Sequence, residues 1–151
     1  LVADFSLEDV NPTSATYEEF VSPRDYLGRI SAWYFGHSTW GYCRAQFGHL
    51  DDLQKEILEE YPDSEIQIIG INGAGHESGV ETAADGRDLP LLQDREGVDV
   101  SSLWDVTYRD VIILDEQNEY YTTYNLTSND LSEAEKYAAL KATLLAAAGL
   151  N

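Results

Sequence analysis

The stretch that decides the fold is GHSTWGYCRAQ, residues 36–46. It follows a short run of aromatic and β-forming residues, 30–35, which is typical of a buried central strand. It precedes residues 42–61, in which apolar side chains recur at helical spacing over an acidic outer face. The sequence therefore predicts a strand, a short turn and a long helix whose first turn contains the chain's single cysteine, Cys43.

A cysteine at the start of a helix is suited to thiol–disulfide exchange, which needs an exposed nucleophile that is ionised near neutral pH. The N-terminus of a helix favours this state, because unpaired N–H groups and the helix dipole stabilise an anion. A second sulfur three residues later lies one turn further on and attacks the mixed disulfide formed by the first. Here the first of these positions holds Trp40, whose indole neither ionises nor bonds to sulfur, and Cys43 holds the second.

The rest of the chain predicts an α/β protein. Strand-like segments lie at residues 3–7, 65–72, 89–92, 110–115 and 119–124. The last two form a predicted hairpin that turns at Asn118. Residues 132–148 predict a helix with a Ser132–Glu135 capping box and Gly149 just after its end. This order predicts one domain, residues 1–151, with a central mixed sheet flanked by helices.

Composition excludes several classes of function. The chain has 28 acidic and 9 basic residues and a net charge of −19, which disfavours nucleic acid and anionic lipid as partners. We see no apolar run near the roughly 20 residues that span a bilayer. Three scattered histidines and one cysteine do not have the spacing of a zinc site. The chain begins at Leu1 and contains no methionine, so we expect a processed or trimmed form. The acidic composition favours a location outside the cell, and we expect a secreted or periplasmic protein.

Taken together, the segments from residue 33 to about residue 126 resemble the thioredoxin-like superfamily, including its redoxin group. Within it, the likeness is greatest to the N-terminal domain of selenoprotein P and its bacterial relatives. The matching pieces are Gly41-Tyr42-Cys43, Ala45-Gln46, residues 50–53, 66–73, 89–93, 100–104 and 110–115. The resemblance implies a thioredoxin-like fold and a motif of the selenocysteine-x-x-cysteine type.

The resemblance also implies roles for individual residues. Trp40 stands where the family has its selenocysteine or cysteine nucleophile, and Cys43 corresponds to the resolving thiol. Because the selenocysteine codon differs from that of tryptophan by one base, one hypothesis is that Trp40 is a production substitute for a native selenol; the other is that Trp40 is the natural residue. Selenium in this form is the sole cofactor that we expect. The other candidate site residues are Gly41 and Tyr42, which would stabilise the anion, and His37, Thr39, Arg44, Arg109 and Asp110 in supporting positions.

Two positions depart from ordinary thioredoxins. Asp110 stands where those proteins have a cis proline beside the active-site sulfurs. The resemblance to selenoprotein P accounts for this difference, because that pattern also has an acid at this position. Tyr34 replaces the buried acid of the strand before the motif. Near a thiolate at Cys43, a carboxylate at Asp110 would be unfavourable, whereas Arg44 or Arg109 would be favourable.

Three functional interpretations remain open. The first is a thiol or selenol oxidoreductase acting on a thiol, disulfide or peroxide with a thiol electron donor, inactive in the Trp40 form. The second is a non-catalytic binding module in which Trp40 and Tyr42 form an exposed aromatic patch. The third is a peroxidase of the peroxiredoxin type, for which Thr39 and Arg44 are the available supporting residues.

Overall fold

A computed structural model of the chain describes residues 1–150. The strands are β1 (Leu7–Glu8), β2 (Phe20–Val21), β3 (Ser31–Gly36), β4 (Gln67–Asn72), β5 (Leu91–Gln93), β6 (Asp110–Leu114) and β7 (Tyr120–Asn125). The helices are α1 (Gly41–Glu60), α2 (Val80–Ala84), α3 (Val100–Leu103) and α4 (Ala134–Ala147), with short 3-10 turns at Pro23–Tyr26 and Glu77–Gly79. None of the helices within residues 1–150 is both long and apolar enough to cross a membrane.

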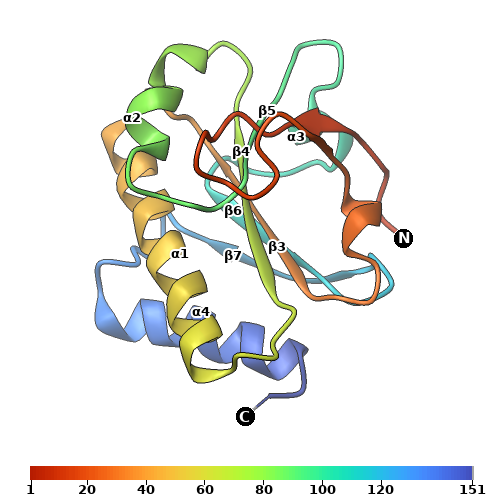
Figure 1. Ribbon diagram of the computed structural model, residues 1–151, viewed down its shortest axis with the longest axis vertical. Coiled ribbons are helices and arrows are strands. Elements are labelled where there is room, and N and C mark those ends of the chain that lie inside the picture. Colours follow the sequence, from red (N-terminus) through yellow and green to blue (C-terminus); the bar gives the residue numbers. More distant parts are fainter. Residues whose placement is uncertain (151) are drawn as a thin grey trace.

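The main sheet is mixed and has five strands in the order β5-β4-β3-β6-β7. β3 is central: it pairs in parallel with β4 and antiparallel with β6. All six residues of β3 are buried, as its aromatic and apolar sequence predicts. A separate two-stranded ribbon, β1 and β2, packs beside β5. The expected mixed sheet with flanking helices is confirmed (Figure 1).

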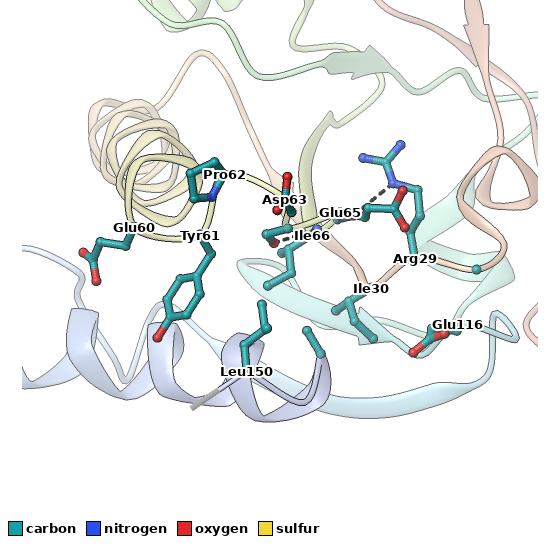
Figure 2. Close-up of a pocket in the computed structure, with 13 residues that line it drawn as sticks. Arg29, Ile30, Glu60, Tyr61, Pro62, Asp63, Glu65, Ile66, Glu116 and Leu150 are labelled. Atoms are coloured by element: carbon teal, nitrogen blue, oxygen red, sulfur yellow. Dashed lines mark hydrogen bonds between the residues drawn. The ribbon is translucent and has the colours of Figure 1, made fainter.

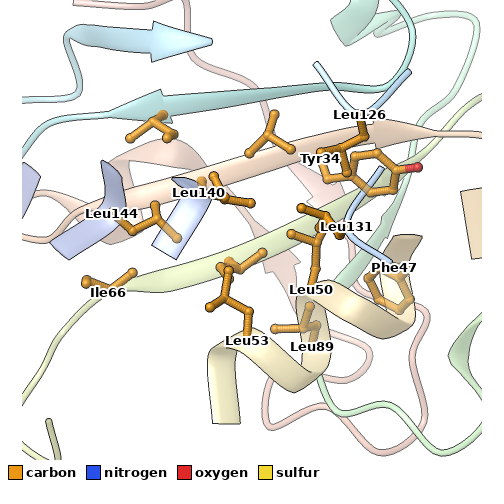
Figure 3. Packing of buried hydrophobic residues seen from close by; sticks show 14 of the residues in the cluster. Tyr34, Phe47, Leu50, Leu53, Ile66, Leu89, Leu126, Leu131, Leu140 and Leu144 are labelled. Atoms are coloured by element: carbon orange, nitrogen blue, oxygen red, sulfur yellow. The ribbon is translucent and has the colours of Figure 1, made fainter. Parts of the chain in front are cut away.

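Two hydrophobic clusters lie on opposite faces of this sheet. One joins alternate residues of β3, β4 and β6 to α1 and α4, and includes Leu50, Leu53, Leu140 and Leu144 (Figure 3). The other lies under the N-terminal segment and α3, around the fully buried Trp33. Burying one aliphatic side chain of this kind is worth about 1.5–3 kcal/mol relative to exposure. The α1 face therefore anchors the helix whose N-terminus carries the candidate site.

The register of the strands decides where the site forms. Gly36 of β3 lies opposite Asn72 of β4, so both parallel strands end at the same edge of the sheet. β6 runs the other way and begins at that edge with Asp110. Three loops therefore meet there: residues 37–40, residues 73–79 and residues 104–109.

Two local predictions about the ends of elements are confirmed. Asn118 has a φ of 60° in the β6–β7 turn, as the hairpin sequence indicates. Gly149 has a φ of 72° directly after Ala148, the C-cap residue of α4. The Gly149 and Leu150 amides donate to the carbonyls of Ala146 and Leu145, which is the Schellman pattern.

Two other local predictions are wrong. The Ser132–Glu135 capping box is absent: α4 begins after Glu133, and no side chain caps it. Asp130 Oδ1 instead accepts from the Ser132 amide at 2.9 Å, which makes a turn where the helix was expected to start. The strand predicted at residues 3–7 is limited to Leu7–Glu8, because its partner β2 is only two residues long.

Candidate active site

Trp40 is the N-cap residue of α1, as the motif predicts. Its carbonyl accepts from the Arg44 amide at 3.1 Å, and its amide donates to the carbonyl of His37 at 3.0 Å. No side chain caps this helix, and its first turn contains no acidic residue. The indole is 45% exposed. Residue 40 therefore lies at the solvent-facing, positive end of a 20-residue helix.

Trp40 packs on a stack of three aromatic rings that come from three different loops. The imidazoles of His37 and His76 are nearly parallel, at an angle of 8° with centroids 4.0 Å apart. Tyr108 stacks on His37 with centroids 4.9 Å apart. The indole lies edge-on to all three rings, with centroid distances of 4.7 Å to His37, 5.0 Å to Tyr108 and 5.9 Å to His76. We call these four residues the aromatic cluster.

Hydrogen bonds and a glycine hold the loops of the aromatic cluster together. A hydrogen bond of 2.6 Å joins Thr39 Oγ1 and His76 Nδ1. The Asn72 side chain accepts from the Ser38 amide at 2.7 Å and donates to the His76 carbonyl at 3.0 Å. Gly79 packs so closely on Ser38 and Thr39 that a Cβ there would overlap their backbone atoms. The backbone of the turn before α1 is thus fixed by the loop that follows β4.

The ring of His37 is neutral at pH 7. Burial lowers its pKa below the ordinary value of 6.5, and the neighbouring His76 and Arg109 lower it further. Its Nδ1 atom is buried and has no hydrogen-bond partner among residues 1–150. His37 therefore contributes stacking to the site, with one ring nitrogen unpaired.

Cys43 lies one turn into α1 and is buried, with 2% of its surface exposed. Beneath it, the Tyr34 hydroxyl donates to the Cys43 carbonyl at 3.5 Å. Burial, and then the nearby Cys43, raise the pKa of Tyr34 well above its ordinary value, so this hydroxyl stays protonated. Tyr34 thus lies against Cys43 as a neutral group.

Arg109 lies immediately before β6 with a φ of 72°, a left-handed conformation that costs a non-glycine residue about 1–3 kcal/mol. Its amide donates to the Phe35 carbonyl at 2.7 Å, and its carbonyl accepts from the Leu126 amide at 2.9 Å. The guanidinium carbon lies 4.3 Å from the ring centre of Tyr42 and 4.5 Å from that of Tyr108. The Tyr42 hydroxyl in turn donates to the Leu126 carbonyl.

The remaining predicted residues have structural contacts. Arg44 Nη1 donates to the Ser38 carbonyl at 3.1 Å, which ties α1 to the preceding turn. Asp110 is buried, and its carboxylate accepts from the Thr107 amide at 2.8 Å and from Asn125 Nδ2 at 2.9 Å. No cis peptide bond occurs in residues 1–150, so the peptide bond before Asp110 is trans. Gly41 is exposed at the first position of α1.

The fold has close counterparts among solved structures. A candidate thiol:disulfide interchange protein DsbE from Chlorobium tepidum superposes with a TM-score of 0.74 at 18% identity, covering 97% of this chain and 94% of that one. A candidate protein disulfide isomerase from Bacteroides thetaiotaomicron gives 0.72 at 19% identity, covering 99% and 88%. The exposed lipoprotein thioredoxin Etrx1 from Streptococcus pneumoniae gives 0.65 at 22% identity, covering 94% and 100%.

The chain has the thioredoxin-like fold. No protein-family profile matches it, and no curated protein matches it in sequence. The fold prediction made from residues 36–46 is therefore confirmed. The narrower likeness to selenoprotein P stays a prediction.

Sequence reasoning missed two members of the aromatic cluster, His76 and Tyr108. A signal for His76 was present, because it follows a predicted parallel strand whose end lies at the same edge as Trp40. Tyr108 lies just before β6, so its position depended on that strand running antiparallel to β3. Neither spacing nor composition indicated that the rings would stack.

A cavity much larger than those at this site lies elsewhere. It measures about 490 Å³ and lies at the opposite end of β3, where Arg29, Ile30 and Glu116 face Pro62, Glu65 and Leu150 (Figure 2). The two hollows that touch the aromatic cluster measure only about 10 and 20 Å³. A substrate at the candidate site would therefore bind on the surface.

Proposed function

We propose that this chain carries the site of a thiol–disulfide oxidoreductase, with residue 40 as the nucleophile position and Cys43 as the resolving thiol. One observation carries the proposal: Trp40 is the N-cap of α1 and Cys43 lies one turn later. The solved structures with the same fold include proteins described as thiol-disulfide oxidoreductases, which supports the same class of chemistry.

The reaction requires sulfur or selenium at residue 40. Its anion, stabilised by the N–H groups of Gly41 and Tyr42, would attack one sulfur of a substrate disulfide and release the other as a thiolate. Cys43, after losing its proton, would attack the residue-40 chalcogen, form the internal bond and release the second substrate thiolate. The substrate gains two electrons, and an external thiol donor returns them to the protein. With Trp40 in place the first step does not occur.

The narrower proposal is that residue 40 is a native selenocysteine. It rests on the resemblance to selenoprotein P, and reading the native gene tests it. A UGA codon at position 40 supports the proposal, and an ordinary tryptophan codon contradicts it. Two solved structures with this fold are described as an exposed lipoprotein and as a secreted oxidoreductase, which supports a secreted or periplasmic location for this chain.

A reductase assay tests the enzymatic proposal directly. With dithiothreitol as donor, a Trp40→Cys variant should reduce the disulfides of insulin by turnover, whereas the Trp40 chain should not. Trp40→Ser is the matched control, because it removes the indole without adding sulfur. Trp40→Cys combined with Cys43→Ser should accumulate a mixed disulfide and turn over poorly. The proposal fails if Trp40→Cys is no faster than Trp40→Ser.

A second candidate function, a non-catalytic binding module, is favoured by one observation. Trp40 is 45% exposed yet packs edge-on against His37, His76 and Tyr108, so a rigid aromatic surface faces solvent. Such a surface suits recognition of a protein partner. A native tryptophan codon, together with a partner lost on Trp40→Ser, would favour this function over catalysis.

A further inference from the structure

Arg109 has a buried guanidinium nitrogen and no carboxylate partner in the described part of the chain. The ion pairs within residues 1–150 all involve Lys55 or Lys141, so no arginine of these residues is paired with an acid. Arg109 Nη1 donates to Thr127 Oγ1 at 3.4 Å, and the side chains of Cys43 and Tyr108 also interact with the guanidinium. Its Nε atom is buried without a hydrogen-bond partner among the same residues, which distinguishes Arg109 as a candidate donor to a bound anion.

The surroundings of Arg109 restrict how an anion can approach it. The ring centres of Tyr42 and Tyr108 lie 4.3 Å and 4.5 Å from the guanidinium carbon, so both rings are in contact with this group. The N–H groups of a guanidinium lie in its plane, and aromatic contacts do not use them up as donors. A planar carboxylate that approaches in that plane accepts two parallel hydrogen bonds. The strained backbone and its two hydrogen bonds, to Phe35 and from Leu126, keep the side chain at this position.

Arg109 also lies where a substrate would meet the nucleophile. Tyr108, against which its guanidinium packs, is also in contact with Trp40, with ring centroids 5.0 Å apart. Tyr42, the second ring against the guanidinium, is the second residue of α1. An anion held by Arg109 would therefore lie beside residue 40.

The charge of the whole chain limits what that anion belongs to. An acidic polypeptide would meet long-range repulsion from a protein of net charge −19. A small molecule with one or two carboxylates meets much less, because repulsion scales with its charge and is screened over about 8 Å at physiological salt. The local cation then decides its binding.

We infer that Arg109 is a specificity-determining residue, and that the site takes a small-molecule disulfide or thiol that carries a carboxylate. This inference rests on the proposed function for the exchange step itself. Arg109 binds the carboxylate and thereby positions the sulfur at residue 40. A cationic disulfide, which the net charge would otherwise attract, is disfavoured at this position.

The first test uses the unmodified chain and needs no activity. Quenching of tryptophan fluorescence by iodide and by caesium is compared at equal ionic strength, and a Trp40→Phe variant isolates the signal of Trp40. Arg109→Gln should weaken the quenching of Trp40 by iodide and strengthen its quenching by caesium. Arg29→Gln is the matched control, because it removes another arginine that packs on a tyrosine, at the opposite end of β3. Equal iodide quenching with and without Arg109 overturns the inference.

The second test uses Trp40→Cys and three disulfides of similar length: 3,3′-dithiodipropionate, bis(2-hydroxyethyl) disulfide and cystamine. The dicarboxylate should react fastest. Arg109→Gln should slow the reaction of the dicarboxylate about tenfold, as expected for loss of one charge-assisted contact. The same substitution should speed the reaction of cystamine. Arg109→Lys should restore only part of the rate, because it keeps the charge and loses the planar donor set. Cystamine reacting fastest in the presence of Arg109 overturns the inference and leaves thiol exchange intact. If no disulfide reacts, the proposed function fails, and the quenching result alone decides the role of Arg109.

Discussion

The two ends of β3 differ in cavity size and in backbone chemistry, and the end with the larger cavity is not the one with the candidate site. At the Ile30 end, an open cavity of about 490 Å³ has the carboxylates of Glu60, Asp63, Glu65 and Glu116 in its walls. At the Gly36 end, the loops close into the aromatic cluster and leave hollows of about 10 and 20 Å³. Each end has one arginine that packs on tyrosine.

What separates the two ends is the backbone chemistry that each presents. The Gly36 end has the N-terminus of α1, whose unpaired N–H groups favour an anion. The Ile30 end has the C-terminus of the same helix, where α1 finishes at Glu60 with no basic residue in its last turn. The small, rigid end therefore suits a reactive anion, although the larger cavity lies at the other end of β3.

The largest expected effect comes from forcing the loops of the rigid end apart. Gly79→Ala places a methyl group into the backbone of Ser38 and Thr39, so the free energy of unfolding should fall by about 2–3 kcal/mol. Gly97→Ala is the matched control, because a Cβ there meets no atom within 4 Å. Urea unfolding followed by far-UV circular dichroism measures both variants. Equal stabilities would show that these loops are not tightly packed.

A smaller effect is expected from the ion pairs that join α4 to the other end of α1. Lys141 Nζ lies 2.6 Å from Glu56 Oε2 and 2.7 Å from Glu60 Oε2. Lys141→Met should cost about 1 kcal/mol at low salt, and less in 1 M sodium chloride, because these partners are partly exposed. Lys136→Met serves as control, since Lys136 forms no ion pair within residues 1–150. A loss that does not change with salt would contradict an electrostatic origin.

The smallest effect is a pH dependence at the rigid end. Burial, His76 and Arg109 lower the pKa of His37 in the folded chain, so the unfolded chain binds more protons between the folded and unfolded values. Stability in that range rises with pH, so the contribution is present above the unfolded value of 6.5 and is lost as the pH falls from there through the lower folded value. His37→Asn should flatten this slope relative to the unsubstituted chain in urea unfolding. An unchanged slope in His37→Asn would remove His37 as the cause.

The sequence predicted the fold correctly where the residues of a single element, by their apolar spacing or their backbone preferences, were enough to define it. Residues 36–46 indicate the strand, turn and helix because the apolar period changes within a few residues. Gly149 and Asn118 mark positions that need a left-handed backbone. The predicted capping box at Ser132 was wrong because Asp130 accepts from the Ser132 amide, which the Glu135 side chain would bond in a capping box. A single motif does not show which local hydrogen bond is stronger.

The site was predicted less completely because part of it exists only in the tertiary structure. Trp40 and Cys43 follow from spacing along one helix. The stack of His37, His76 and Tyr108 requires the register of β3 against two neighbouring strands of opposite direction. The contacts of Arg109 with two tyrosines depend on its left-handed backbone conformation. An arginine in a sequence does not indicate that conformation.

The central claim is that residue 40 and Cys43 form a working pair at the N-terminus of α1. Positions three apart on a helix have Cβ atoms about 5–6 Å apart, which small backbone shifts reduce to the separation that a disulfide needs. The direct measurement is the oxidation state of the Trp40→Cys variant in buffers of graded dithiothreitol redox potential, by thiol labelling and mass spectrometry. We predict one reversible internal disulfide that forms and breaks across the series. Two free thiols in every oxidising buffer would contradict the account.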